Sequence, residues 1–298
     1  MVEKQDFNIG ICGFGFLGGA IVHGFSLHAN IKIYDKYKSG FDTLEDMVKS
    51  SEYIFFCLPS PMFDDNGEQD LSILDGAVKA VHDEVIRIRE LGDLSRKIAI
   101  IKSTVLPGTN QIFQERYPEL VFVSSPEFLT ARSNKLDFIC AARHIFGGED
   151  KYALDRVVEL FKHRFGNSVP IYTTDWRTSE MVKYAANCFF AVKVSYFNFI
   201  YDLCQKLGIK YDDVRDMVLA DGRIGRSHCD VMSGEQVSDK GKRQYGGACF
   251  PKDINALINF SKELGLDPKL IEASWKQNIE GRPERDWEKI YGVISKRK

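Results

Sequence analysis

The residues best suited to covalent chemistry stand late in the sequence. Cys249 comes two residues before Pro251, and proline is favoured at the first position of a helix. Because a helix N-terminus stabilises a thiolate and offers free N–H groups, we expect Cys249 to be the most nucleophilic of the 7 cysteines. Asp253 lies one helical turn further on and could act as a base or orient a water molecule. A buried structural cysteine beside an aspartate that complements the helix dipole would give the same pattern.

A lysine and an asparagine are spaced to act on a single point. Lys183 and Asn187 are at i and i+4 in a mostly apolar segment, so they project from one face of a predicted helix. An ammonium and an amide placed in this way could stabilise the negative charge that develops on an alkoxide or a tetrahedral oxyanion. A solvated polar stripe on the helix is the alternative.

A glycine-rich motif, G-x-G-x-x-G, is formed by Gly13, Gly15 and Gly18 between an apolar, strand-like run and an amphipathic helix. Glycines in this spacing allow a tight turn, the close approach of a pyrophosphate to the backbone, and close packing of helix on strand. The motif also accounts for the longest apolar run, residues 9–22, which is too short and too rich in glycine to span a membrane. An ordinary glycine-rich turn is the alternative.

An acidic residue follows at the end of the second predicted strand. Asp35 lies 20 residues after Gly15, where a carboxylate can accept hydrogen bonds from both hydroxyls of a ribose. The same carboxylate would repel a 2′-phosphate, so the sequence favours NAD over NADP, although Lys36 and Lys38 weaken this preference.

The elements that would position these residues alternate regularly as far as about residue 174. Short apolar runs predict strands, and amphipathic segments of helical length separate them. This alternation predicts an α/β fold, a Rossmann-like doubly wound parallel sheet, in residues 1–174. Two polar groups that follow strands, Lys102-Ser103-Thr104 and the segment 125–129, should line the ligand crevice at the carboxyl ends of the strands. The predicted strands are residues 7–12, 31–34, 53–58, 97–101, 120–124, 144–146 and 169–172.

The character of the sequence changes in residues 175–298, which we expect to form an all-α dimerisation domain. Residues 179–207 contain no Pro or Gly and predict one long connecting helix ended by Gly208. A helix of roughly 30 residues spans about 45 Å, and this one is too apolar to be solvated all round. We therefore expect it to pack on a second copy of the chain. Shorter helices are predicted at residues 212–220, at residues 251–264 and from residue 268 onward, with an irregular stretch over residues 221–248.

Composition excludes several classes of function. The 298 residues suggest about two domains, and 40 Lys+Arg against 42 Asp+Glu give a net charge of -2, which disfavours nucleic acid as a partner. The N-terminal MVEKQDF lacks the positive region of a secretory signal, so we expect a cytoplasmic protein that does not bind membranes. An odd number of cysteines without C-x-x-C, and histidines without metal-binding spacing, predict neither a disulfide framework nor a metal site.

Taken in order, these motifs resemble the UDP-glucose/GDP-mannose dehydrogenase family. The resemblance covers essentially the whole chain, and GG-x-C-F-P-K-D is its most specific motif. It implies a two-step, NAD-dependent oxidation of the primary alcohol of a nucleotide sugar to a carboxylate, of the kind that supplies polysaccharide biosynthesis. The matching segments are GFGFLG (13–18), CLPSP (57–61) with DLS (70–72), KSTVLPGT (102–109), SPEFL (125–129), SEMVKYAAN (179–187), DGRIG (221–225) and GGACFPKD (246–253).

The resemblance also implies roles for individual residues. Cys249 would capture the aldehyde as a thiohemiacetal and later a thioester, while Lys183 and Asn187 would stabilise the oxyanion. Water and protons would be handled by Asp253, Glu127 and Thr104, and Arg223 would reach the substrate across a homodimer. The implied cofactor-binding residues are Gly13, Gly15, Phe16, Leu17, Gly18, Asp35, Pro59 and Thr104. The implied substrate-binding residues are Glu127, Phe128, Leu129, Lys183, Asn187, Arg223 and Gly246.

Some segments depart from the family pattern. Thr130-Ala131-Arg132 stands where the family has Arg-Glu, and Phe199 replaces an acidic residue of the long helix. Lys240, Lys242 and Arg243 could hold a pyrophosphate or form a solvated basic loop. The chain stops about where the family's third domain, which grips the nucleotide, is expected to begin. Two other functions therefore stay open, a non-catalytic NAD-binding or assembly module and a β-hydroxyacid dehydrogenase, for which Cys249 has no role.

Overall fold

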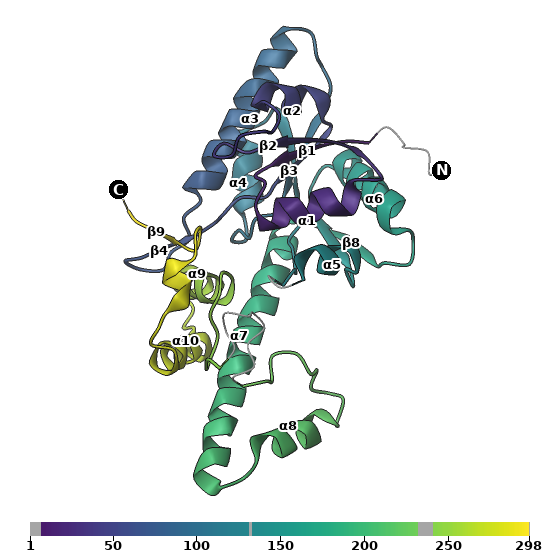
Figure 1. The fold of residues 1–298 in the computed structure, drawn as a ribbon. Helices are drawn as coiled ribbons and strands as arrows, with labels where there is room; N and C mark the ends of the chain where they lie inside the picture. Colours follow the sequence, from purple (N-terminus) through teal and green to yellow (C-terminus); the bar gives the residue numbers. More distant parts are fainter. Residues whose placement is uncertain (1–6, 131–132, 232–240, 298) are drawn as a thin grey trace. The chain divides into compact units, whose positions relative to one another are not determined.

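The computed structural model describes residues 7–130, 133–231 and 241–297 (Figure 1). The chain divides into two compact units. Unit 1 comprises Met1–Ser60 and Asp70–Lys183, and unit 2 comprises Pro61–Gln69 and Tyr184–Lys298. The division falls inside the longest helix. The domain boundary expected after residue 174 stays a prediction.

Unit 1 is built on a 7-stranded sheet with the order β2-β1-β3-β5-β6-β7-β8. Strands β1, β3 and β5 have alternate side chains in two separate cores, such as Phe55 in one and Ile54 in the other, because successive residues of a strand point to opposite faces. All seven predicted strands are present, with bounds within two residues of those expected. The strands are β1 (Asn8–Cys12), β2 (Asn30–Tyr34), β3 (Tyr53–Phe56), β5 (Lys97–Ile101), β6 (Leu120–Ser124), β7 (His144–Gly147) and β8 (Ile171–Thr174).

The sheet is mostly parallel, with one exception that the sequence did not predict. Strands β6 and β7 are antiparallel and share the single register pair Ser124 and Gly147. A parallel connection needs a crossover of about a dozen residues, most often a long helix. Among the described residues between these strands, the one helix is α5 (Asn134–Ile139), which has 6 residues. The predicted parallel sheet is thus confirmed for the other strand pairs, whereas strand periodicity carries no information about direction and could not predict this antiparallel pair.

Helices cover both faces of the sheet in unit 1, as expected for a doubly wound fold (Figure 1). One core contains side chains of α1 (Phe16–Phe25), α5 and α6 (Lys151–Phe165). The other contains side chains of α2 (Leu44–Ser50), α3 (Ser72–Glu90) and α4 (Thr109–Arg116). Helix α1 packs closely on α5, because a Cβ at Gly24 would overlap the ring of Phe138.

The long helix α7 (Trp176–Leu207) has 32 residues and begins three residues before the predicted start. Its first turns are fastened to the end of strand β6. The Trp176 indole Nε1 donates to the Phe122 carbonyl at 2.9 Å, and the hydroxyls of Ser179 and Ser124 lie 3.1 Å apart. No helix within the described ranges has the length and apolarity needed to cross a bilayer.

In its described residues, unit 2 contains three further α-helices and a small sheet. Helices α8 (Tyr211–Leu219), α9 (Phe250–Glu263) and α10 (Lys269–Gly281) correspond to the predicted ones, but α10 ends where Arg282 precedes Pro283, since a residue before proline disfavours the helical conformation. A 3-10 helix, η2 (Asp286–Lys289), follows. The parallel pair β4 (Met62–Phe63) and β9 (Ile294–Ser295) was not expected in an all-α domain, and strands of 2 residues are too short to show periodicity.

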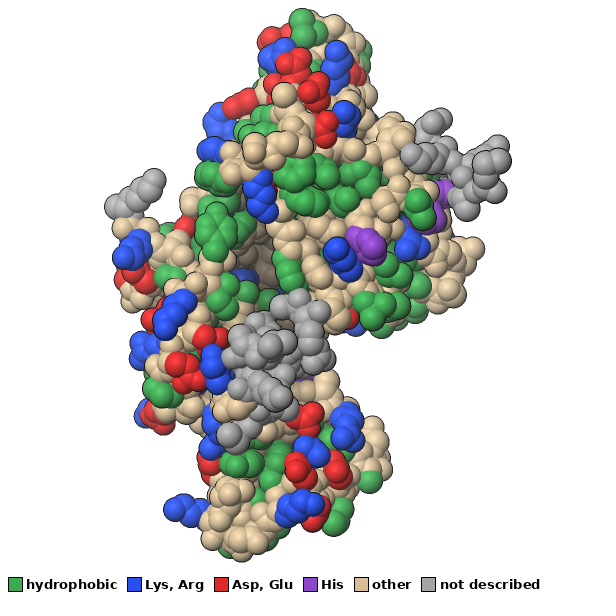
Figure 2. Space-filling view, in the orientation of Figure 1, with side chains coloured by type: hydrophobic (Ala, Val, Ile, Leu, Met, Phe, Trp, Pro, Cys, Tyr) green, Lys and Arg blue, Asp and Glu red, His purple; other side chains and the backbone are tan. Residues whose placement is uncertain are grey.

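The charged side chains on one face of the molecule are dispersed (Figure 2). On the face drawn in Figure 2, basic and acidic side chains are interspersed and do not gather into a broad patch of one sign. This agrees with the small net charge of -2, and a wide basic surface for nucleic acid is not seen on this face.

Candidate active site

The three motif glycines meet three different local demands. Gly13 has φ +97°, a conformation that L side chains rarely adopt, and a Cβ there would lie 2.7 Å from the Cys57 carbonyl oxygen. A Cβ at Gly18 would overlap the Gly13 carbonyl oxygen, so helix α1 packs directly on the turn. Gly15, at the N-cap of α1, has nothing within 4 Å of its Cβ position. Open space before the N-terminus of a helix suits a pyrophosphate.

The carboxylate of Asp35 is joined to this loop. Its Oδ2 accepts a hydrogen bond from the Phe14 N–H at 2.9 Å, and its Oδ1 accepts one from the Tyr37 N–H at 3.0 Å. Lys38 donates from Nζ to the Phe14 carbonyl oxygen at 2.5 Å, so this ammonium is engaged by the loop. The peptide groups on both sides of Phe14 are therefore held by side chains that follow strand β2. Phe16 and Leu17 form the first turn of α1.

Hydroxyl groups join the carboxyl ends of strands β3 and β5. The Ser103 hydroxyl donates to the Leu58 carbonyl at 2.8 Å and accepts from the Leu58 N–H at 3.1 Å. The Ser60 hydroxyl donates to the Thr104 carbonyl at 2.7 Å. These bonds bring the segment that contains Pro59 alongside Thr104, as the sheet topology predicts for two neighbouring parallel strands.

Glu127 forms an ion pair that sequence reasoning missed. Its Oε2 lies 2.8 Å from Nζ of Lys102, which also donates to the Ser125 hydroxyl at 3.1 Å. The second carboxylate oxygen accepts from the Phe128 N–H at 2.9 Å. Lys102 is 3% exposed, and a buried ammonium requires such a partner. A lysine that ends a buried strand was the available signal for this pair.

Two cations lie close to the ring of Phe128 within unit 1. Nζ of Lys183 is 5.3 Å from the ring centroid and the guanidinium carbon of Arg143 is 4.4 Å from it. Lys183 is buried, and its ammonium has no hydrogen bond or ion pair with any of the residues that the structure describes. A desolvated ammonium without a carboxylate partner is suited to meet charge that develops on a ligand. Leu129 packs against the core of unit 1.

In unit 2, Asn187 and Asp253 are brought together. The Asn187 amide donates from Nδ2 to Oδ2 of Asp253 at 2.5 Å, and Lys252 donates from Nζ to Oδ1 at 2.5 Å. The Asp253 N–H donates to the Cys249 carbonyl at 3.0 Å, which closes the first turn of α9. Asp253 is 1% exposed, so the amide and the ammonium together stabilise a buried carboxylate. Lys252 had no predicted role, although it stands beside Asp253 in the motif.

Cys249 occupies the N-cap of α9, with Pro251 in the first turn, so the helix begins one residue before its predicted start and the thiol lies at the N-terminus of a helix as expected. Its side chain is exposed, and among the other six cysteines only Cys140 is exposed too. Burial raises the pKa of Cys12 to about 12 and also raises the pKa of Cys57, Cys188 and Cys229. Exposure at a helix N-terminus therefore sets Cys249 apart from the buried thiols.

The turn before Cys249 is seated on a buried arginine. A Cβ at Gly246 would overlap the Arg282 guanidinium, and Gly247 has φ +71°. Arg282 is 1% exposed and donates from Nε to Oδ1 of Asp286 at 2.6 Å. The other oxygen of Asp286 accepts from the Gly247 N–H at 3.2 Å. Gly246 thus has a packing role, whatever it contributes to substrate binding.

The remaining predicted cations differ in their surroundings. Arg223 is exposed and pairs with Asp221, two residues earlier. The Arg243 guanidinium donates to both carboxylate oxygens of Asp202 at 2.8 Å, so it fastens its loop to α7 and is not a free cation. Lys242 is half-buried. Lys240, Ala131 and Arg132 lie outside the described residues.

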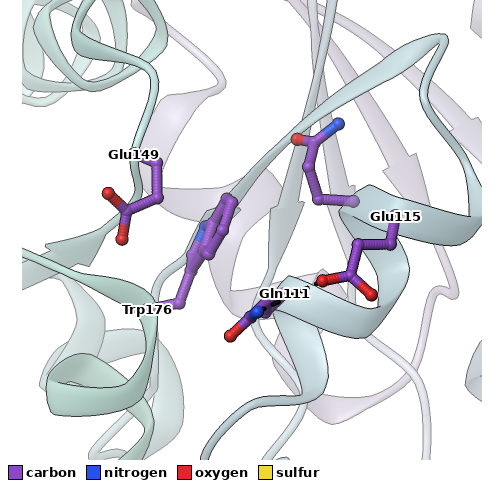
Figure 3. Close-up of a pocket in the computed structure, with 5 residues that line it drawn as sticks. Gln111, Glu115, Glu149 and Trp176 are labelled. Carbon is purple, nitrogen blue, oxygen red and sulfur yellow. Dashed lines mark hydrogen bonds between the residues drawn. The ribbon is translucent and has the colours of Figure 1, made fainter.

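A hollow of about 310 Å³ in unit 1 contains none of the predicted site residues (Figure 3). Figure 3 shows its polar lining around the face of the Trp176 indole. The lining residues are Gln111, Gln114, Glu115, Glu149 and Trp176. Over the described parts of the chain, no group of His, Cys, Asp and Glu side chains could hold a metal ion.

A doubly wound sheet whose first turn has these glycines, with Asp35 after the second strand, defines a dinucleotide-binding protein. Residues 26–165 match the NAD binding domain of the UDP-glucose/GDP-mannose dehydrogenase family, and residues 177–280 match its central domain. The chain belongs to this family, and its cofactor is NAD.

Individual relatives agree with this assignment. The chain is 31% identical over 241 residues to a UDP-glucose 6-dehydrogenase of Rhizobium meliloti, covering 78% of this chain and 51% of the relative. It is 31% identical over 258 residues to UDP-glucose 6-dehydrogenase TuaD of Bacillus subtilis, covering 84% and 51%. A UDP-glucose dehydrogenase structure from Pyrobaculum islandicum matches with a TM-score of 0.81 and 26% identity, over 94% of this chain and 69% of that one. The chain thus spans about half the length of these curated relatives.

Proposed function

We propose that this protein oxidises the primary alcohol of a nucleotide sugar to a carboxylate, as in the conversion of UDP-glucose to UDP-glucuronate. The observation that carries the proposal is the start of α9, where an exposed cysteine stands one turn from a buried carboxylate held by Asn187 and Lys252. A nucleophile beside a group that can handle water is what a thioester route requires. The family relatives named above, which are UDP-glucose dehydrogenases, support the choice of substrate class.

The residues have distinct roles in the proposed route. NAD, when bound, accepts a hydride in each of the two oxidations. The Cys249 sulfur adds to the carbonyl carbon of the aldehyde to form a thiohemiacetal, whose oxygen receives hydrogen bonds from Lys183 and Asn187. After the second oxidation, water attacks the thioester, the C–S bond breaks, and the thiolate leaves. Asp253, Glu127 and Thr104 position the water and accept protons. One alcohol, two NAD⁺ and one water thus give one carboxylate, two NADH and three protons.

The proposed cofactor residues fit NAD in their local structure. The open space beside Gly15 would take the pyrophosphate, and the fixed carboxylate of Asp35 would accept from the ribose hydroxyls. Pro59 and Thr104 stand where strands β3 and β5 end, next to each other in the sheet. Phe128, Leu129 and Gly246 would contact the substrate through their backbone groups, and Phe128 also through its ring.

We also propose a cytoplasmic homodimer that forms through α7. Phe189, Tyr196, Phe199 and Leu203 are exposed and recur at intervals of three to seven residues, so they form one apolar stripe along the helix. A second copy of the chain would cover this stripe, since a long apolar stripe is costly to leave in water. Arg223, exposed on unit 2, would then reach the substrate of the partner.

Turnover tests the proposal directly. Under reducing conditions, the protein with NAD and UDP-glucose, or another nucleotide sugar, should form two NADH for each sugar acid. A panel of nucleotide sugars that yields no NADH, together with measurable NAD binding, would contradict catalysis and support the non-catalytic module.

A further inference from the structure

Helix α4 begins without a capping side chain of its own. Its N-cap is Gly108, with φ +101°, which cannot accept the N–H groups that every helix leaves unpaired in its first turn. The side chain of Glu180, on α7, takes this place. Its Oε2 accepts from the Gly108 N–H at 2.6 Å, and its Oε1 accepts from the Asn110 N–H at 2.9 Å and from the Asn110 amide at 2.7 Å.

Glu180 is an unusual buried carboxylate. It is 2% exposed and has no ion pair with a cation among the described residues. Burial raises its pKa, although the bonds from Asn110 and Gly108 act in the opposite direction. The charge is therefore stabilised by N–H groups and by the positive end of the α4 dipole alone. An apolar side chain could pack between the helices but would leave these N–H groups without an acceptor, so the carboxylate is needed to cap α4.

The carboxylate also connects two segments that carry predicted site residues. The loop of residues 102–108 starts at strand β5 and carries Thr104, whose carbonyl accepts from the Ser60 hydroxyl. Glu180 holds the other end of this loop. On α7, Glu180 lies one turn before Lys183 and directly after Ser179, which contacts the end of strand β6. Thr104 and Lys183 thus belong to one framework that is closed by the bonds of Glu180.

We propose that Glu180 is a positioning residue, which holds the loop of Thr104 in fixed relation to the turn of α7 that carries Lys183. It touches neither substrate nor cofactor. The proposal rests on the function proposed above as far as catalysis is concerned, and on NAD binding as far as the loop is concerned.

The test uses Glu180→Gln in the full chain. The amide keeps the shape but presents an N–H₂ group to one of the N–H donors, so at least one bond is lost. Amide hydrogen exchange over residues 102–110 should become about tenfold faster or more, and the Kd for NAD should rise about threefold to tenfold. With a nucleotide sugar that the wild type oxidises, the kcat of the variant should fall by about tenfold or more, while its KM for the sugar changes less than about threefold. Glu115→Gln, at an exposed carboxylate on α4, the helix that Glu180 caps, should match the wild type.

The outcomes separate the two proposals. If the wild type lacks turnover, the proposed function fails, while exchange and NAD affinity still decide the role of Glu180. Wild-type exchange over residues 102–110 in Glu180→Gln, or faster exchange spread evenly over all of unit 1, would overturn the positioning role. Should that variant not fold, Asn110→Ala removes one of the three bonds, the one from the side-chain amide to Oε1, and leaves the two backbone bonds. It should also give faster exchange confined to residues 102–110, and its failure to do so would equally overturn the role.

Discussion

The glycine-rich loop and the start of α9 are both turns that lead into a helix, yet they are built in different ways. The loop depends on the absence of side chains, since Gly13 and Gly18 each leave no room for a Cβ. The start of α9 depends on side chains, two of them from distant parts of the chain: Asn187 and the neighbouring Lys252 bind Asp253, and Arg282 lies under Gly246. A backbone that binds a cofactor needs conformational freedom and space, whereas a group that handles protons needs a controlled charge.

The largest effect is expected from a substitution of Cys249, at the start of α9. Cys249→Ser should leave stability within about 0.5 kcal/mol, because the side chain is exposed and serine is favoured at an N-cap. The second oxidation should slow by about a thousandfold or more, because a hydroxyl is a much poorer nucleophile. The measurements are the number of NADH molecules formed per sugar and the amount of aldehyde intermediate that can be trapped. Cys140→Ser, at the other exposed cysteine, is the matched control and should have wild-type activity.

The loop is tested by Gly18→Ala against Gly19→Ala. A Cβ at Gly18 would overlap backbone, whereas Gly19 has nothing within 4 Å of its Cβ position. Displacement of α1 should weaken NAD binding about a hundredfold in the first variant, measured by calorimetry. The second variant should bind as the wild type does. Equal affinities of the two would show that close packing at Gly18 does not govern the loop.

The charge at the start of α9 is tested by Asp253→Ala. Removal of the carboxylate leaves the Lys252 ammonium, whose side chain is 12% exposed, without its partner. The free energy of unfolding should fall by about 3 to 5 kcal/mol, measured by denaturant titration. Asp267→Ala removes an exposed partner of Lys269 in the same unit and should cost less than about 1 kcal/mol. Similar losses for both would argue against a buried charge cluster.

The pH dependence of stability tests a buried titratable group in unit 1, for comparison with the buried charge at the start of α9. Burial, followed by the nearby Lys102 ammonium, lowers the pKa of His144 to about 4. Between about pH 6.5 and pH 4 the unfolded chain binds a proton that the folded chain does not, so stability should fall by about 3 kcal/mol as the pH drops through this range. His144→Phe keeps the contacts with Phe161 and Phe165 and should remove this part of the pH dependence of unfolding. An unchanged pH dependence would assign it to other groups.

The part of the site that could be predicted is the part that local sequence determines. Glycines, a helix-starting proline and a strand-end aspartate each act within a few residues, and the Gly13 loop, Asp35 after the second strand and the place of Cys249 just ahead of a helix were all predicted. The partners of the carboxylates were not, because Lys102 and Glu127, or Asn187 and Asp253, meet only after the chain has folded. The direction of β7 and the pair β4 and β9 were missed for the same reason.

The seat of Gly246 on Arg282 has a further consequence. Gly246 precedes α9 and Arg282 follows α10, so their contact joins the two open ends of this helical hairpin. The turn between the helices carries the exposed Leu264 and Leu266. A circular permutant whose new termini lie in that turn would break the covalent link between α9 and α10. The non-covalent contact between Gly246 and Arg282 would still hold the two helices together. Cys249 would stay on the side of this contact, so the hairpin offers a place to graft new termini or a reporter domain.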